Sequence, residues 1–172
     1  MDWDIIGHQW AADILKGHIT RDTLRHAYLF TGPEGVGRRT LALRFTQALN
    51  CPNPPAPGVP CRECRTCQQI DTMHHPDLLI LESEEDSQVL RVDQIRDILP
   101  GLSLTPYESR YKIALFLRFE EANPSAANAL LKSLEEPPEQ VVMILTAENA
   151  DHLLETIVSR CEEIHLRPVP LP

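Results

Sequence analysis

Short runs of consecutive apolar residues alternate along the chain with segments in which apolar residues recur every three or four positions. Continuous apolar runs are typical of parallel strands, because helices cover both faces of such strands. We expect five strands of this kind, at residues 27–30, 77–81, 112–117, 141–147 and 163–166. Strands that alternate with helices predict an α/β fold of three layers around a central parallel sheet.

The helical segments are recognised by a single apolar stripe at a spacing of about 3.6 residues. Asn123 and Pro124 are a typical cap and first-turn residue for one of them. Pro100 predicts the end of another, because proline cannot donate the next hydrogen bond of a helix. The expected helices occupy residues 41–49, 92–99, 123–136 and 152–159.

The size and composition of the chain fit one globular domain. Its 172 residues, 42% of them hydrophobic, can bury a substantial core, and a formal charge of -9 argues against binding of a nucleic-acid backbone by this chain alone. No apolar run reaches the roughly 18 residues of a membrane span, and the acidic N-terminus does not resemble a signal peptide, so we expect a cytoplasmic protein without membrane contact. Three prolines among the last five residues predict that a linker at 167–172 follows a domain at 1–166.

A glycine-rich stretch, GPEGVGRRT, joins the first strand to the next helix. This is the setting of a phosphate-binding loop, since glycines let the backbone turn tightly and point N–H groups at a phosphate. Two arginines stand where the motif has lysine and then serine or threonine, and an arginine side chain cannot ligate Mg²⁺. The candidate phosphate-binding residues are Gly32, Gly35, Gly37, Arg38, Arg39 and Thr40.

Hydrolysis of a nucleotide also requires acidic residues at the end of a middle strand, to hold Mg²⁺ and orient water. The strand 112–117 is followed instead by Arg118 and Phe119, and the first carboxylates are Glu120 and Glu121. Both departures favour a loop that keeps the shape of the motif without hydrolysing ATP. The residues leave open whether ATP or ADP binds there.

Four cysteines follow the first helix after the loop with the spacing C-x9-C-x2-C-x2-C. Overlapping C-x2-C pairs place thiolates around one ion, and a tetrahedral set of four thiolates favours zinc. A site filled by four thiolates has no position for a reactive water, so its role would be structural. A disulfide pair or an iron–sulfur cluster is the alternative. The expected zinc ligands, in an insertion at about residues 50–70, are Cys51, Cys61, Cys64 and Cys67.

The fifth cysteine and two adjacent histidines fit structural roles. We interpret Cys161 as a small buried residue. We interpret His74 and His75, which precede Pro76, as residues of a surface loop rather than additional metal ligands.

Several motifs occur together and in the order found in one protein family. They are IIGHQ (5–9), HAYLFTGPEGVGRRT (26–40), the four-cysteine insertion, HPDLL (75–79), ANALLKSLEEPP (127–138) and SRC (159–161). Over essentially its whole length the chain resembles the clamp-loader subunits of bacterial DNA polymerase III. The resemblance implies an AAA+ P-loop NTPase-like domain, with a helical lid and an oligomerisation collar beyond Pro172.

Within this family, the ATP-hydrolysing gamma/tau type carries an intact lysine and threonine in its loop and an Asp-Glu pair after its strand. The delta-prime type usually has an inactive site. Arg38, Arg39 and Arg118 depart from the first type. The resemblance therefore favours the delta-prime type, with no ATPase activity of its own.

The same resemblance implies that Arg160, between Ser159 and Cys161, reaches the ATP site of a neighbouring subunit. A lone arginine there would otherwise be a solvated charge at a helix end. Thr146 matches a phosphate-sensing position, although a hydrogen bond at the strand end is the role we favour. The implied partners are gamma/tau and delta subunits in a heteropentameric ring and, through that ring, the sliding clamp and primed DNA. The isolated chain is expected to be a monomer.

Two alternative functions stay open from the residues. One is an active gamma/tau-like ATPase in which Arg38 replaces lysine and Thr40 binds Mg²⁺. The other is a nucleotide sensor that binds without hydrolysis.

Overall fold

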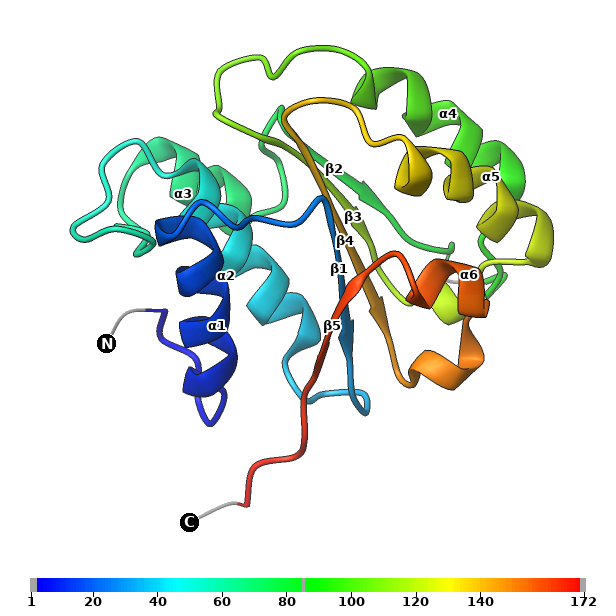
Figure 1. Cartoon of the computed structure of the whole chain (residues 1–172), viewed down its shortest axis with the longest axis horizontal. Helices are drawn as coiled ribbons and strands as arrows, with labels where there is room; N and C mark the ends of the chain where they lie inside the picture. Colours follow the sequence, from blue (N-terminus) through cyan, green and yellow to red (C-terminus); the bar gives the residue numbers. More distant parts are fainter. Residues whose placement is uncertain (1–2, 85, 171–172) are drawn as a thin grey trace.

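The structure is a computed structural model that describes residues 3–84 and 86–170. Within these residues, a single parallel sheet of five strands forms the middle layer, in the order β2-β3-β4-β1-β5 (Figure 1). This confirms the predicted α/β fold. The strands are β1 (Ala27–Thr31), β2 (Leu78–Leu81), β3 (Lys112–Phe116), β4 (Val141–Ala147) and β5 (Glu162–His165).

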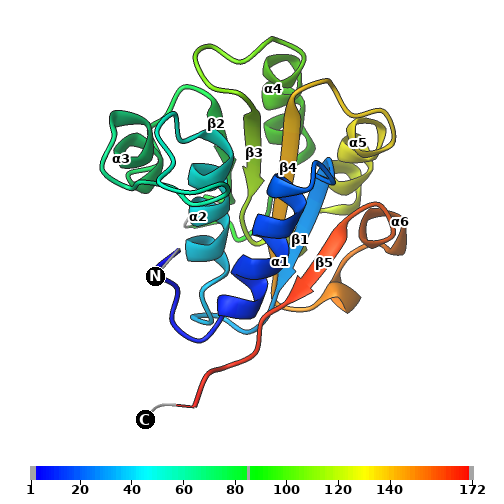
Figure 2. The same cartoon turned by 60° about the vertical axis from the view of Figure 1, so that its left-hand side comes forward.

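Helices cover the two faces of the sheet as separate layers (Figures 1 and 2). On one face lie α1 (Gln9–Thr20), α2 (Arg38–Asn50) and α3 (Arg65–Asp71). On the other lie α4 (Val92–Leu102), α5 (Pro124–Glu135) and α6 (Glu155–Val158), together with the 3-10 turns η1 (Phe119–Glu121) and η2 (Ala150–His152). No helix within residues 3–84 and 86–170 has the length and apolar content needed to span a bilayer.

The continuous apolar runs are explained by two hydrophobic cores, one on each side of the sheet. Tyr28 and Phe30 of β1 point into the core under α1 and α2, whereas Leu29 points into the core under α4 and α5. Alternate residues of a strand face opposite sides, so a strand covered on both faces must be apolar throughout. In the first core, the rings of Tyr28 and Phe45 meet edge to face with centroids 4.8 Å apart.

The predicted end of the helix at Pro100 is wrong, because α4 continues through Pro100 to Leu102. Proline removes one helical hydrogen bond, but Leu102 is buried in the core, and the ammonium of Lys112 donates to the carbonyl of Gly101 at 2.7 Å. Burial of one leucine side chain is worth roughly 1.5–3 kcal/mol, which offsets the cost of the missing bond.

The predicted helix at 152–159 is also wrong in its extent. Asn149 accepts a hydrogen bond from the N–H of Asp151 and caps the short turn η2, after which Leu153 returns to extended backbone. The α-helix α6 begins only at Glu155. The segment is therefore two short turns with a break between them.

Asp77 lies directly before β2, which begins one residue later than predicted. Its buried carboxylate accepts hydrogen bonds from the backbone N–H groups of Tyr107, Glu108 and Ser109, at 2.6, 3.0 and 2.8 Å. His75 is also buried, and its ring lies between the N–H of Asp77 and the carboxylate of Glu108. The surface-loop interpretation is therefore wrong for His75, which together with Asp77 fixes the loop that precedes β3.

We expect this carboxylate to make the protein sensitive to acid. Burial alone would raise the pKa of Asp77, but the N–H donors of Glu108, Tyr107 and Ser109 outweigh burial and hold that pKa below its usual range. Because the pKa is depressed in the folded state, the stabilisation is complete above the ordinary pKa of about 4 and is lost as the pH falls below it.

Urea unfolding between pH 7 and pH 3 measures this effect. Asp77→Asn should lower the free energy of unfolding at pH 7 by roughly 1–3 kcal/mol, since the amide keeps one oxygen acceptor but loses the charge. The variant should lose less stability than the wild type on acidification. Equal acid sensitivity of the two proteins would show that other carboxylates are responsible.

Candidate functional site

The glycine-rich loop leaves the carboxyl end of β1 and leads directly into α2. Gly32 and Gly37 have φ angles of +144° and +110°, which residues with a Cβ rarely adopt. A Cβ on Gly32 would also lie 2.5 Å from the carbonyl oxygen of Leu166. The first hydrogen bond of α2 runs from the N–H of Leu41 to the carbonyl of Gly37, so the preceding N–H groups of the helix have no partner within the helix.

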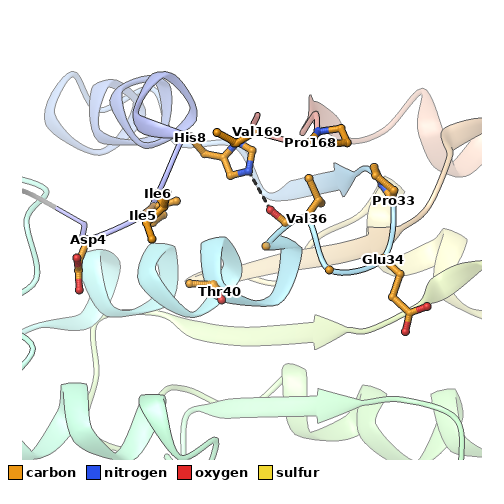
Figure 3. Close-up of a pocket in the computed structure, with 12 residues that line it drawn as sticks. Asp4, Ile5, Ile6, His8, Pro33, Glu34, Val36, Thr40, Pro168 and Val169 are labelled. Carbon is orange, nitrogen blue, oxygen red and sulfur yellow. Dashed lines mark hydrogen bonds between the residues drawn. The ribbon is translucent and has the colours of Figure 1, made fainter. Parts of the chain in front are cut away.

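Two cavities open on either side of this loop. The larger has a volume of about 460 Å³ and lies between the loop, the N-terminal segment and Val169 (Figure 3). The Nε2 atom of His8 lies 2.9 Å from the carbonyl oxygen of Val36, whereas its Nδ1 is buried and has no partner among the described residues. His8 is a candidate residue that the sequence did not single out, although it lies in the motif IIGHQ.

The smaller cavity, of about 320 Å³, lies between the loop and the ends of β3 and β4. The two cavities share part of the loop as a common wall. We call the smaller one the arginine cavity, after the residues that line it: Glu34, Gly35, Gly37, Arg38, Arg39, Thr40, Leu117, Arg118 and Thr146.

At the end of β3 the backbone of Arg118 adopts a left-handed conformation, with φ +52°. Its N–H donates to the hydroxyl of Thr146 at 2.9 Å, so Thr146 makes a hydrogen bond at the end of β4. The guanidinium of Arg118 lies 3.6 Å from Glu82 and 3.5 Å from Glu121. A cation thus stands at the edge of the sheet where hydrolysis requires free carboxylates.

The carboxylates near this edge are engaged. Glu82 forms ion pairs with Arg39, at 3.4 Å, and with Arg118. Glu121 accepts a hydrogen bond from the hydroxyl of Ser83. Glu120 accepts a hydrogen bond from the backbone N–H of Glu148. Glu82 was not singled out from the sequence. Its position directly after a strand was the available signal, because the carboxyl ends of parallel strands meet at one edge of the sheet.

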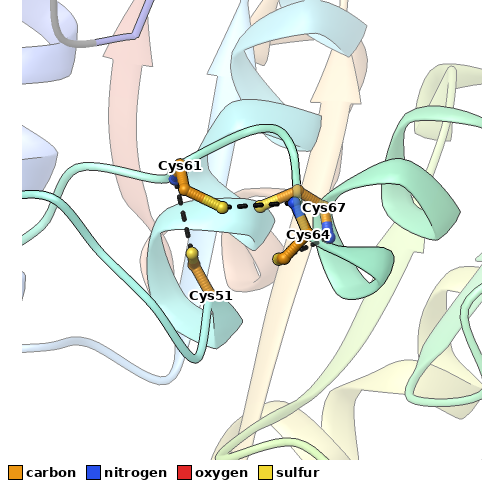
Figure 4. A group of neighbouring side chains, drawn as sticks. All are labelled: Cys51, Cys61, Cys64 and Cys67. Atoms are coloured by element: carbon orange, nitrogen blue, oxygen red, sulfur yellow. Dashed lines mark hydrogen bonds between the residues drawn. The ribbon is translucent and has the colours of Figure 1, made fainter.

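The four cysteines predicted as ligands come together (Figure 4). Their sulfur atoms all lie within 4.8 Å of one another, compared with about 3.8 Å in a tetrahedral site whose zinc–sulfur bonds measure about 2.3 Å. Backbone N–H groups donate to three of the sulfurs at 3.3–3.4 Å, namely those of Cys51, Cys61 and Cys64. Such bonds favour thiolates, and the residues present fit a metal ion held by sulfur.

The surroundings shift the thiols in different directions. Burial raises the pKa of Cys67 and of Cys51, whereas the N–H groups of Glu63 and Cys64 outweigh burial and lower the pKa of Cys61 to about 7. A divalent cation would displace the proton from each thiol that it binds.

The cysteine segment is attached to the rest of the domain by buried hydrogen bonds. Trp3 donates from its indole to the carbonyl of Gly58 at 2.9 Å, and Gln47 of α2 donates to the carbonyl of Cys67 at 2.8 Å. A metal ion held there would therefore fix a surface segment onto α2 and the N-terminal segment.

Arg160 lies apart from both cavities, on the side of the domain formed by α5 and α6. Its guanidinium donates to the carbonyl of Thr156 at 2.8 Å and lies 3.0 Å from the carboxylate of Glu135, and the side chain is one-third exposed. The neighbouring Cys161 is partly buried, which raises the pKa of its thiol to about 12. The structure thus separates Arg160 from the glycine-rich loop of its own chain.

Comparison with known proteins gives consistent similarities in sequence and in structure. A family model described as "DNA polymerase III, delta subunit" matches residues 7–170. DNA polymerase III subunit delta' of Pseudomonas aeruginosa is 43% identical over 147 residues, which cover 86% of this chain and 44% of that protein. DNA polymerase III subunit tau of Escherichia coli is 32% identical over 164 residues, which cover 95% of this chain and 25% of that protein.

Among solved structures, a protein related to the gamma subunit of DNA polymerase III from Thermotoga maritima has the same fold. It superimposes with a TM-score of 0.65 at 24% identity, over 95% of this chain and 46% of that structure. The chain therefore spans less than half the length of each of these relatives.

Proposed function

This chain belongs to the family described as DNA polymerase III, delta subunit, and from that membership we propose that it is the AAA+ domain of a delta-prime-like clamp-loader subunit. Its three-layer fold is that of AAA+ P-loop NTPases. Relatives named as delta' and as tau subunits both match, so the choice between the two types rests on the residues of the site.

The observation that carries the delta-prime assignment is the guanidinium of Arg118 at the end of β3. A magnesium-dependent ATPase needs a carboxylate there to hold the cation. Here a cation occupies the position and is paired with Glu82 and Glu121. Together with Arg38 and Arg39 in place of lysine and a hydroxyl residue, this favours a domain that does not hydrolyse ATP.

We assign to Arg160 the role of an arginine that acts on the ATP site of a neighbouring subunit. A guanidinium there would stabilise the negative charge that builds up on the transferred phosphoryl group. Its partial exposure and its distance from its own loop support this role, because it is available to another subunit.

The proposed partners are gamma/tau and delta subunits in a heteropentameric ring that loads a sliding clamp onto primed DNA in the cytoplasm. A net charge of -9 agrees with contact to DNA through the assembly rather than through this chain. We propose that the cysteine cluster holds a structural zinc ion, which would stabilise the segment between α2 and β2.

A phosphate-release assay tests the absence of hydrolysis. With ATP and Mg²⁺, the wild-type chain should release phosphate no faster than Arg38→Ala, because neither protein can hold the metal in a reactive position. Saturable turnover that Arg38→Ala abolishes would instead favour the gamma/tau-like ATPase, in which Arg38 replaces lysine.

Reconstitution tests the role in replication. A full-length subunit that contains this domain should be required, together with gamma/tau and delta subunits, for loading of the clamp onto primed DNA. Full loading by an assembly that lacks the subunit would contradict the proposal.

A further inference from the structure

The segment before α1 is anchored by a buried tryptophan. Residues 3–8, which we call the N-terminal strap, contain no helix or strand, yet Trp3 is fully buried. Its ring lies close to parallel with that of Phe45 in α2, with centroids 6.2 Å apart, and its indole N–H donates to the carbonyl of Gly58 at 2.9 Å. A buried indole usually needs such an acceptor. One end of the strap is therefore held jointly by α2 and by the cysteine segment, residues 51–67.

A network of charges ties the same end of the strap to the same partners. Arg62 of the cysteine segment lies 3.1 Å from the carboxylate of Asp4 and 3.9 Å from that of Asp71, the last residue of α3. Arg44 of α2 donates to the backbone carbonyl of Trp3 at 3.1 Å and is paired with Asp71 at 2.9 Å. An isolated surface ion pair is worth little, but linked pairs of this kind define a geometry. Arg62 and Arg44 therefore position the strap together.

Both attachment points of the strap depend on the clustered cysteines. Gly58 lies in the loop that Cys51 and Cys61 close, and Arg62 follows Cys61 directly (Figure 4). Apolar burial does little to order this loop, because residues 52–57 are all exposed. A metal ion held by the four sulfurs would close the loop and fix the turn at Arg62, and so would supply the order that apolar contacts do not.

The other end of the strap forms a wall of the cavity beside the glycine-rich loop (Figure 3). Ile5, Ile6 and His8 line that cavity, whose volume is about 460 Å³. His8 is buried, and its Nε2 atom lies 2.9 Å from the carbonyl oxygen of Val36 in the loop. Because few residues separate Trp3 from His8, the position of one limits the position of the other.

We propose that a metal ion at the cysteine cluster controls the conformation of the N-terminal strap and, through it, the wall of the cavity beside His8. Loss of the metal loosens the loop at Gly58 and the turn at Arg62, and the strap leaves its place on α2. The sheet stays folded, since its two cores are formed mainly by other residues. The inference rests on the metal site proposed above and extends it, because the cluster acts on a cavity whose lining residues include none of the four clustered cysteines.

Tryptophan fluorescence of the chain with Trp10→Phe tests the anchor. The sequence contains two tryptophans, so Trp3 is then the single indole, and it is buried whereas Trp10 is about half exposed. Acrylamide should quench Trp3 weakly with zinc bound and several-fold more strongly after a chelator removes the zinc, with the emission shifted to longer wavelength. Return of zinc should reverse both changes. Far-UV circular dichroism should keep the signal of the helices throughout.

Chemical modification of histidine tests the other end of the strap. Diethyl pyrocarbonate reacts with accessible imidazoles. His8, which is 3% exposed, should therefore be protected with zinc bound and should react several-fold faster after chelation. His152 is the internal control, because it is exposed on η2 and is not part of the strap. Mass spectrometry of the peptides measures both sites in one sample.

Arg62→Gln, made in the chain with Trp10→Phe, separates the strap from the metal. It breaks both ion pairs of Arg62 but leaves the four sulfurs in place, so the metal content should be unchanged while acrylamide quenching of Trp3 rises. Arg25→Gln is the matched control, since it removes an exposed ion pair with Glu162 and changes the net charge equally. Its metal content and its quenching should equal those of the parent chain.

Metal content, measured separately, distinguishes this inference from the metal site on which it rests. A chain that binds zinc, but shows equal quenching of Trp3 and equal reactivity of His8 with and without it, would overturn the inference and leave the site intact. A chain that binds no metal would overturn both. Loss of the circular dichroism signal on chelation would also overturn the inference, since the domain would then unfold as a whole rather than release the strap.

Discussion

Replacement of Arg160 by alanine in an assembled clamp loader is expected to lower ATP turnover at the adjacent site by roughly 10³-fold, at the lower end of the range for arginines supplied from a neighbouring subunit. The guanidinium of Arg160 is held in place by a hydrogen bond to the carbonyl of Thr156 and by an ion pair with Glu135, and two-thirds of the side chain is covered. A cation that is already held in position needs little reorganisation when negative charge develops on the phosphoryl group in the transition state. For this reason one side chain can have so large an effect on the rate.

The matched control is Arg25→Ala. Arg25 forms an exposed ion pair with Glu162 at 3.5 Å, so its loss changes the charge equally and removes a surface pair of similar kind. Arg160→Lys separates charge from geometry, since lysine keeps the charge but lacks the planar fork of donors. Assembly of each variant ring is checked by gel filtration. Turnover retained by a correctly assembled Arg160→Ala ring would contradict the assignment.

Loss of the metal ion proposed for the cysteine cluster is expected to have the largest effect on the free energy of unfolding. Cys64→Ser removes a sulfur that accepts a hydrogen bond from the N–H of Cys67 and caps α3. Metal content should fall from about one zinc per chain to near zero. Where free zinc exceeds its dissociation constant by about 1,000-fold, the free energy of unfolding should fall by about 4 kcal/mol.

Metal analysis and urea unfolding together measure this outcome, and a chelator should reproduce it in the wild type. Cys161→Ser is the control, because Cys161 is a partly buried thiol that is not one of the four clustered cysteines. Full metal content in Cys64→Ser would show that the ligands are assigned wrongly. Iron instead of zinc would favour the iron–sulfur alternative.

Features set by local sequence were predicted well. The five strands were placed to within about one residue, because both faces of the sheet are buried and each strand is apolar throughout. The cap formed by Asn123, which accepts from the N–H of Ala126, depends only on neighbours in the chain. The grouping of the cysteines likewise follows from their short spacing.

Two of the errors arose where residues outside the local segment decided the outcome, whereas the break in the helix expected at 152–159 follows from the local cap at Asn149. Pro100 lies inside α4 for two reasons. Leu102 is buried in the core, and the ammonium of Lys112, ten residues beyond Leu102, donates a hydrogen bond to the last turn of the helix. His75 is buried because it meets a loop more than thirty residues further along. Local propensity is a weak preference, and tertiary burial outweighs it.

The sequence by itself determined the order of strands and helices, the glycine loop without its lysine and the set of four cysteines, since periodicity, turn chemistry and ligand spacing act over a few residues. Only the tertiary structure decided the partners of each charge. It placed Arg118 between Glu82 and Glu121 and left Arg38 buried without a partner among the described residues. Charge compensation depends on distances between segments that are far apart in the chain, and the sequence does not contain those distances explicitly.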